Sequence, residues 1–191
     1  MAPEAAPGNS PAETCRIAEA DGGRTQVLLS GALHSGWAGR LAAALAARRV
    51  SVVRGRGIRR SGHLWDIELL LEPLDRGVSL ADIDYLALAR EGRTPAEASD
   101  ASLELESFSL QRTADDLIVD LEGVDGLGFL DRVLRVFAFY SLFPRELHLE
   151  TRGPKVKDRF LLQGLGGQAP SLQVCEAVGL KLRALSGPQA Q

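Results

Sequence analysis

Residues 117–140, LIVDLEGVDGLGFLDRVLRVFAFY, decide the fold of this chain. Apolar residues alternate with polar ones from Leu117 to Glu122, which is typical of a β-strand with one buried face. A glycine-bearing turn follows this strand. From Gly128 to Tyr140 the apolar residues recur at helical spacing and form one face, which consists of Leu130, Val133, Leu134 and Phe137. The stretch therefore predicts a strand that leads through a tight turn into an amphipathic helix.

The same order of elements occurs earlier in the chain. Aligning Gly39 with Gly128 places Leu41 on Leu130, inside a helix expected in both copies. The copies run from about residue 14 to 90 and from about 102 to 185. Each copy has about 80–90 residues, which is the size of a small domain and more than a solenoid repeat contains. The sequence therefore predicts a duplicated domain.

Each copy is expected to contain strands and helices in the order ββαββα. The expected strands are 16–20, 26–33, 50–60 and 64–71 in the first copy and 103–111, 117–122, 143–151 and 159–163 in the second. The closing helix of the first copy is expected to begin at Ser79, with Asp82 as its capping partner. That of the second copy is expected to begin near Pro170 and Ser171.

The leading strand of each copy defines the fold class. If it pairs with the next strand, it fills the edge that the last strand fills in a βαββαβ ferredoxin-like unit. We therefore expect an α+β protein with two ferredoxin-like domains, each ββαββα with a four-stranded antiparallel sheet and two helices on one face. Two alternatives stay open: residues 103–112 could be the last strand of the first copy, or equivalent strands could be exchanged between the copies.

Two segments fall outside the copies. Residues 1–12, MAPEAAPGNSPA, lack the basic start and apolar stretch of a secretory signal and carry three prolines, so a disordered tail is expected. Residues 91–101 are polar and contain Gly92 and Pro95, which predicts a linker. The expected domains are therefore 13–90 and 102–187.

Composition and charge argue against several classes of protein. A formal net charge of −3 and a pI near 5.7 disfavour nucleic acid and anionic membranes as partners. The longest smooth apolar stretch, Leu41–Ala47, is too short to cross a bilayer. Cys15 and Cys175 indicate neither a disulfide framework nor a zinc site. We expect a cytoplasmic protein with no nucleic-acid or membrane partner.

Several short motifs of the second copy together form a known pattern. They are the strand Leu117–Glu122, the turn Val124–Gly128 with the helix onset Phe129-Leu130, and the segments Leu147–Thr151 and Asp158–Leu162. In these motifs the second copy resembles the ACT domain family. The first copy resembles it in residues 36–41 and 66–69. With its leading strands, the chain is similar to the paired ACT domains of bacterial uridylyltransferase/uridylyl-removing enzymes and of plant ACT-repeat proteins. The resemblance implies a small ligand, usually an amino acid, bound at an interface between domains, and binding that alters the association of partners.

The turn between strand and helix is the candidate ligand site. Glycine there lets backbone N–H groups approach a ligand closely, and a helix N-terminus favours a carboxylate. In the second copy we expect Asp125 to meet a ligand ammonium group and Gly126 and Gly128 to meet its carboxylate. The candidates in the first copy are His34, Ser35, Gly36 and Gly39, with Gly36 at the position of the aspartate. The alternative for all of them is a helix N-cap and a tight turn without a ligand.

The sequence offers no catalytic set and no metal site. The carboxylates Asp115, Asp116, Asp120 and Glu122 have no His or Lys partner nearby, and His63 and His148 are isolated. The arginines between Arg48 and Arg60 are interpreted as charges that keep an edge strand from pairing, with an anion- or nucleic-acid-binding strand as the alternative.

We therefore predict a non-enzymatic regulatory protein, without a cofactor, that senses a small ligand through tandem ACT-like domains. Its expected partners are a second copy of the chain or a regulated protein. The alternative is a protein-interaction or dimerisation module that has lost ligand binding.

Overall fold

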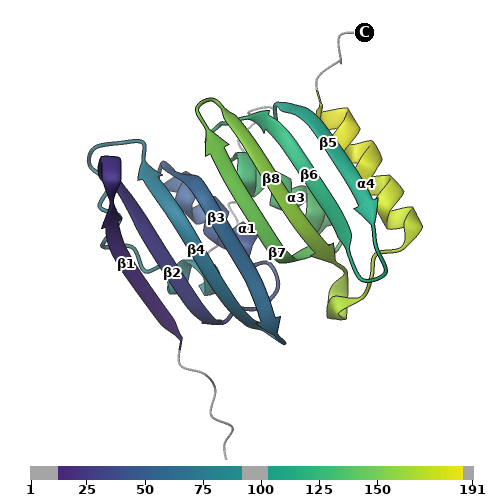
Figure 1. Cartoon of the computed structure of the whole chain (residues 1–191), viewed down its shortest axis with the longest axis horizontal. Helices are drawn as coiled ribbons and strands as arrows, with labels where there is room; N and C mark the ends of the chain where they lie inside the picture. Colours follow the sequence, from purple (N-terminus) through teal and green to yellow (C-terminus); the bar gives the residue numbers. More distant parts are fainter. Residues whose placement is uncertain (1–12, 92–102, 187–191) are drawn as a thin grey trace, which may run out of the picture.

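The computed structural model describes residues 13–91 and 103–186, here called the first and the second half. The first half consists of β1 (Thr14–Ala20), β2 (Arg24–Ala32), α1 (Trp37–Ala47), β3 (Val50–Ser61), β4 (Leu64–Pro73) and α2 (Tyr85–Glu91). The second half consists of β5 (Leu105–Arg112), β6 (Leu117–Val124), α3 (Phe129–Phe139), β7 (Phe143–Arg152), β8 (Lys155–Gln163) and α4 (Leu172–Leu185). The α+β class is confirmed (Figure 1). The expected tail, and the expected linker apart from Glu91, lie outside the described residues.

All eight described strands form one antiparallel sheet in the order β1-β2-β4-β3-β7-β8-β6-β5. Figure 1 shows α1, α3 and α4 on the same face of this sheet. The two groups of four strands join where β3 pairs with β7, from Arg54 opposite Glu150 to Ile58 opposite Glu146. The structure thus replaces the two expected four-stranded sheets by a single one. The pairing satisfies two rows of backbone groups that would otherwise be exposed edges.

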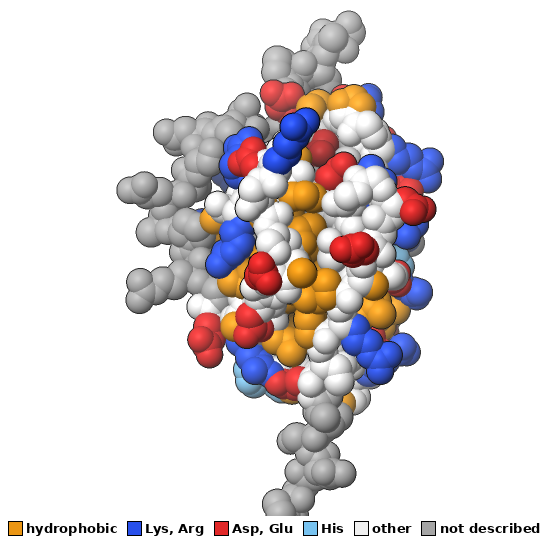
Figure 2. Space-filling view, turned by 90° about the vertical axis from the view of Figure 1, so that its left-hand side faces the viewer, with side chains coloured by type: hydrophobic (Ala, Val, Ile, Leu, Met, Phe, Trp, Pro, Cys, Tyr) orange, Lys and Arg blue, Asp and Glu red, His pale blue; other side chains and the backbone are white. Residues whose placement is uncertain are grey.

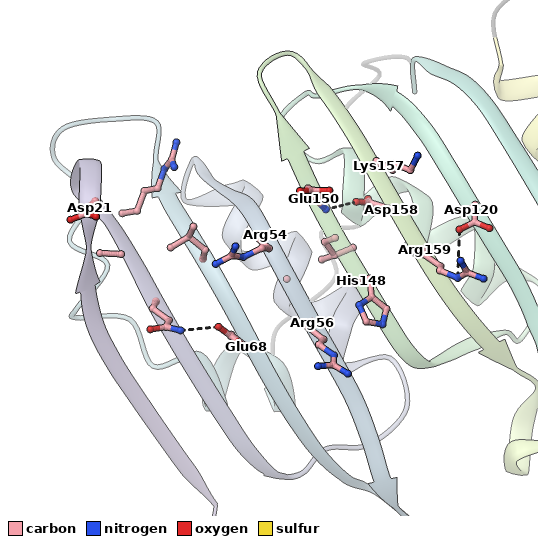
Figure 3. Close-up of a pocket in the computed structure, with 16 residues that line it drawn as sticks. Asp21, Arg54, Arg56, Glu68, Asp120, His148, Glu150, Lys157, Asp158 and Arg159 are labelled. Atoms are coloured by element: carbon pink, nitrogen blue, oxygen red, sulfur yellow. Dashed lines mark hydrogen bonds and ion pairs between the residues drawn. The ribbon is translucent and has the colours of Figure 1, made fainter.

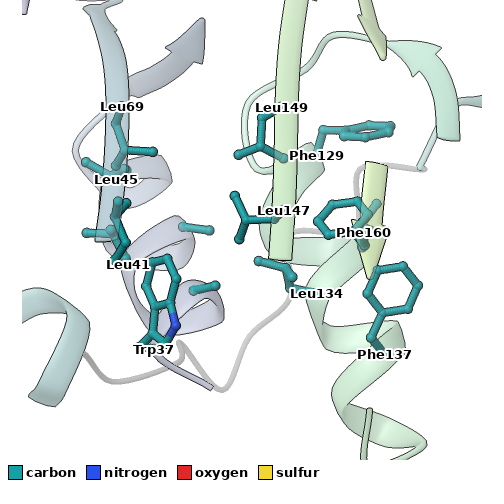
Figure 4. Close-up of a cluster of buried hydrophobic side chains, with 14 of the residues drawn as sticks. Trp37, Leu41, Leu45, Leu69, Phe129, Leu134, Phe137, Leu147, Leu149 and Phe160 are labelled. Carbon is teal, nitrogen blue, oxygen red and sulfur yellow. The ribbon is translucent and has the colours of Figure 1, made fainter. Parts of the chain in front are cut away.

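We call the junction of β3 with β7 and of α1 with α3 the seam. In Figure 4, Trp37 of the first half and Leu134 and Leu147 of the second half belong to one cluster of buried side chains. Gly55 of β3 faces this layer, and a Cβ atom on it would lie 2.9 Å from Leu149 Cδ1. Because the buried cluster runs through both halves, the division into domains at 13–90 and 102–187 stays a prediction.

The arginines of β3 lie on a central strand of the sheet and not on the edge strand that was expected. β3 is a central strand of the sheet, so Arg54 and Arg56 do not protect an edge. They are exposed and alternate with the buried Gly55 and Gly57, which places the arginines on the side of the sheet without helices. The edge-strand interpretation is therefore wrong, because the second half covers the edge on which it was based.

The leading strands pair within their own halves. β1 pairs with β2 from Thr14 opposite Ser30 to Ala20 opposite Arg24, and β5 pairs with β6. The assignment of residues 103–112 to the first copy is therefore wrong. Among the described strands no equivalent strands are exchanged between the halves.

The internal repeat has a different register from the one expected. Gly36 and Gly128 are the N-caps of α1 and α3, with φ of 84° and 82°. Arg49 and Ser141, just after these helices, have φ of 56° and 57° and lie at the same spacing. Gly128 therefore corresponds to Gly36 and not to Gly39. An error of three residues is close to one helical turn, so the apolar faces still matched.

The closing helices differ in how well their starts were predicted. α4 begins as expected after Ser171, whose Oγ accepts a hydrogen bond from the Val174 N–H (3.2 Å). α2 begins only at Tyr85, where the Asp84 carboxylate accepts from the Ala87 N–H (3.0 Å). The start expected at Ser79 is therefore wrong, and Asp84 is the capping residue.

Candidate functional site

The turn between β6 and α3 is held by backbone hydrogen bonds. The Asp125 N–H donates to the carbonyl of Pro154 (2.8 Å), and the Phe129 N–H donates to the carbonyl of Gly126 (2.9 Å). Gly128 adopts a left-handed conformation that favours glycine. Burial raises the pKa of Asp125, while a hydrogen bond from the Gly126 N–H opposes the rise. The turn thus fixes a half-buried carboxyl group at the start of α3.

This turn lies at the seam and lines a cavity of about 50 Å³. Asp125, Gly126 and Gly128 all contribute to its wall, so the structure brings the three candidates of the second half together. The opposite wall comes from the first half and consists of Ala42, Leu45 and Ala46 of α1 and residues 50–52 of β3. We call this cavity the seam pocket. Both halves are needed to form it.

Asp158 is a further residue of the seam pocket, and it was not among the expected site residues. It points inward from β8 between Val156 and Phe160 and is only 4% exposed. Its Oδ1 accepts a hydrogen bond from the Glu150 N–H (3.3 Å; Figure 3). Burial raises the pKa of Asp158 to about 7, the Glu150 N–H opposes this, and the charge of Asp125 adds to it. The signal for Asp158 in the sequence is a carboxylate at an inward-facing position of a strand in which buried and exposed residues alternate.

Arg132 also lies beside this turn and was not expected. Its guanidinium group is near both glycines, since a Cβ atom on Gly126 would lie 3.9 Å from Nη2. Its buried Nε has no hydrogen-bond partner among the described residues. The corresponding Arg40 of the first half donates from Nε to the carbonyl of Ala89 (2.8 Å). Arg132 therefore retains a donor that an anionic group could satisfy.

The turn of the first half has the same backbone and a different composition. The Leu33 N–H donates to the carbonyl of His63 (2.8 Å), as Asp125 does to Pro154, so Leu33 occupies the position of the aspartate. Ser35 and Gly36 line a hollow of about 20 Å³. The ring of His34 contacts that of His63, with centroids 4.9 Å apart.

Gly39 is not part of this turn. It lies within α1, and a Cβ atom on it would lie 3.9 Å from Leu134 Cβ, so it belongs to the contact between α1 and α3. The first half therefore brings only part of its expected set to one place, and no carboxylate is among them.

The open face of the sheet carries a wider depression of about 810 Å³ (Figure 3). Its basic and acidic residues are interspersed: Arg24, Arg54, Arg56, Lys157 and Arg159 with Asp21, Glu68, Asp120, Glu150 and Asp158. No Phe, Tyr or Trp lines it. Base stacking needs exposed aromatic rings, and phosphate binding needs a clear excess of positive charge. This face therefore gives little support to a nucleic-acid site.

Residues 13–91 and 103–186 contain neither a membrane-spanning helix nor a cluster of metal ligands. No helix there is long and apolar enough to cross a membrane. Nor do three His, Cys, Asp or Glu side chains come together as metal ligands in these residues.

Comparison with known proteins gives one structural likeness. No protein-family model matches the chain, and no curated protein matches it. An aspartate kinase from Synechocystis has a similar structure, with a TM-score of 0.50 and 14% sequence identity. The match covers 84% of this chain and 27% of the kinase. At this identity the likeness shows the fold alone.

Proposed function

We propose that this chain is a non-catalytic regulatory protein made of two ACT-type units, and that it binds a small amino acid in the seam pocket. The observation that carries the proposal is the meeting of the Asp125–Gly128 turn with α1 and β3 of the other half. The resemblance of the sequence to ACT domains and the fold of the structural relative support it.

The groups around the seam pocket are those that an α-amino acid requires. Asp125 supplies a negative charge for an ammonium group. For the ligand carboxylate, the N-terminus of α3 offers backbone N–H groups. The apolar wall from α1 would contact a short side chain.

Binding at this place would couple the ligand to the packing of the two halves. A ligand that contacts both walls binds only when the two halves are packed together at the seam. It therefore stabilises this packed arrangement by its binding free energy. A partner protein that recognises the closed seam would then respond to the concentration of the ligand. We propose this as the regulatory output.

A thermal-shift screen of the full chain against the twenty amino acids tests the proposal. A ligand at a hundred times its Kd stabilises the folded state by about 2.7 kcal/mol, which raises the melting temperature by several degrees. We expect Asp125→Ala to abolish this shift. Asp82→Ala, which removes an exposed carboxylate far from the turn in sequence, should leave it unchanged. A screen in which no amino acid raises the melting temperature would contradict the proposal.

A second candidate function is dimerisation through the edge strand β1. Residues Thr14–Glu19 are all exposed, and Ile17 is 38% exposed although it faces the same side as the buried Val27. The opposite edge differs, because Leu105 of β5 is buried and a Cβ atom on Gly179 of α4 would lie 3.0 Å from Leu110 Cδ1. Figure 2 shows hydrophobic side chains along the middle of the β1 side, with charged ones around them.

The occupant we propose for this edge is β1 of a second copy. The halves already join edge to edge through β3 and β7, and the same kind of pairing would satisfy the open backbone groups of β1. Sedimentation velocity across a range of concentrations should show a dimer that Ile17→Glu dissociates. Leu180→Glu, at an exposed position of α4, is the matched control. A wild-type chain that stays monomeric at all concentrations rejects this candidate.

A further inference from the structure

Asp158 has no counterpart in the first half. In the paired strands, Leu121 of β6 faces Asp158 of β8, and the corresponding Leu29 of β2 faces Ile67 of β4. Ile67 is 3% exposed and belongs to the apolar cluster. The second half therefore holds a carboxyl group where the same fold accommodates a hydrocarbon side chain.

A buried carboxylate with so few partners is costly. Among the described residues, Oδ1 accepts the one hydrogen bond from Glu150, and Oδ2 accepts none. Because a carboxylate can accept about four hydrogen bonds, most of its capacity is unused. Burial of an incompletely paired charge opposes folding. A ligand that supplies the missing partner offsets this cost when it binds.

The other groups around Asp158 do not supply a positive partner. The flanking Lys157 and Arg159, which line the open-face depression together with Asp158, are paired with Glu122 (2.9 Å) and Asp120 (3.6 Å). On the β6–α3 turn, Asp125 carries the same charge. On α3, Asp131 is engaged with Arg135 (3.0 Å). The residues of α1 and β3 that line the pocket are Ala42, Leu45, Ala46, Val50, Ser51 and Val52, none of which titrates. Glu150 contributes its backbone N–H, and Arg132 of α3 lies on the side of the two glycines. The acidic pair Asp125 and Asp158 therefore faces a cavity with no cation in its lining.

The size of the seam pocket limits what can enter it. A water molecule needs at least about 10–15 Å³ measured in this way, and the pocket has about 50 Å³. Roughly three to five non-hydrogen atoms therefore fit without movement of the walls. This matches an ammonium group with a short chain and rejects an aromatic or long basic side chain.

We infer that Asp125 and Asp158 together form a receptor for the ammonium group of a small amino acid of glycine size, and that binding releases a proton from this pair. The inference rests on the proposed function for the carboxylate end of the ligand. The proton balance is as follows: the amine binds in its charged form, Asp158 loses the proton that it holds when the pocket is empty, and this proton goes to solvent.

The release of a proton makes the affinity depend on pH. The pKa of Asp158 in the empty pocket is about 7, so the pair holds a proton below this pH. There the ligand must displace it, and the apparent Kd falls about tenfold for each unit of rising pH. Well above this pH the pair is ionised and the Kd becomes constant.

Isothermal titration of the full chain between pH 5.5 and 8.5 tests the inference with four probes. Glycine carries both groups, methylammonium chloride the amine alone, sodium acetate the carboxylate alone, and potassium chloride a simple cation. We expect glycine and methylammonium to bind with the pH dependence just described. Buffers of different ionisation enthalpy should report the release of up to one proton at pH 6.

Asp158→Asn is the main variant, since it keeps the shape of the side chain and removes its charge. We expect it to weaken glycine binding more than tenfold at pH 8 and to flatten the pH profile. Asp125→Asn provides a second variant, which should weaken glycine binding but keep a pH dependence, because burial is the main cause of the raised pKa of Asp158. Asp82→Asn is the matched control with a wild-type profile. Far-UV circular dichroism and the melting temperature of each variant check its folding.

The outcomes separate the inference from the proposed function. Glycine binding that is independent of pH, or unchanged in Asp158→Asn, overturns the inference and leaves the proposed function intact. Binding of methylammonium with a flat amino-acid screen supports the receptor and rejects amino-acid sensing. Equal binding of potassium and methylammonium overturns the inference in favour of a site for simple cations.

Discussion

The two halves place different side chains on the same backbone. The first half has Leu33 after β2 and Ile67 in β4, whereas the second has Asp125 and Asp158 at the corresponding positions. Both turns use a left-handed glycine and the same backbone hydrogen bond. The comparison shows that the geometry of the turn is a requirement of the fold, because the first half keeps it without a carboxylate. Under the proposed function, the two carboxylates are what distinguishes the turn of the second half from that of the first.

The largest expected difference between the halves is in the pH dependence of stability. The pKa of Asp158 is raised from 3.8 to about 7 by burial, so the folded state holds a proton that the unfolded state loses between these values. Stability contributed by this group is therefore present below pH 4 and is lost as the pH rises to 7, by on the order of 4 kcal/mol. Urea unfolding of the ligand-free chain from pH 4 to 8 measures the slope.

Asp158→Asn is the control for this prediction. The pKa of Asp66 is lowered by its hydrogen bonds with Arg60 and Ser30, and this gives the opposite slope at low pH, so the difference between wild type and variant isolates Asp158. The variant should be more stable than wild type at pH 8 and similar at pH 4. Equal slopes for the two proteins would show that Asp158 ionises normally in the fold.

The next largest effect concerns the cores of the two helices. Phe137 of α3 and Leu45 of α1 occupy corresponding buried positions. Truncation leaves a cavity, so we expect Phe137→Ala to cost about 4 kcal/mol and Leu45→Ala about 3 kcal/mol. Because one cluster runs through the seam, both variants should unfold in a single transition in urea.

Leu180→Ala controls for loss of an apolar side chain, because Leu180 is largely exposed and its truncation should change stability by less than about 0.5 kcal/mol. Two separate transitions, with each variant shifting only one of them, would instead show that the halves unfold as two independent domains and that the seam does not couple them.

The smallest effect tests the closing helices. Ser171 caps α4 and Asp84 caps α2, and replacement of either by alanine should cost about 1 kcal/mol because one backbone N–H loses its partner. Chemical denaturation measures both. Ser171→Asp should retain wild-type stability, since aspartate is an equally good cap. A loss as large as that of Ser171→Ala would mean that the cap is not what Ser171 contributes.

The candidate site was predicted in part. Asp125, Gly126 and Gly128 could be proposed from the sequence because a glycine turn between a strand and a helix has a local signature, and the structure brings all three to the seam pocket. Asp158 and Arg132 were missed, since their role depends on which residues lie opposite them in space. Gly39 was included because the repeat was aligned one helical turn out of register.

By itself the sequence determined the α+β class, the order ββαββα in each half, and the inward set of β6, because alternation and helical periodicity are local properties that burial enforces. Only the tertiary structure decided that β3 meets β7 and that the Arg54 strand is central. Edge-to-edge pairing uses backbone groups that every sequence carries, so no residue pattern encodes the partner. The seam pocket and the burial of Asp158 follow from that pairing.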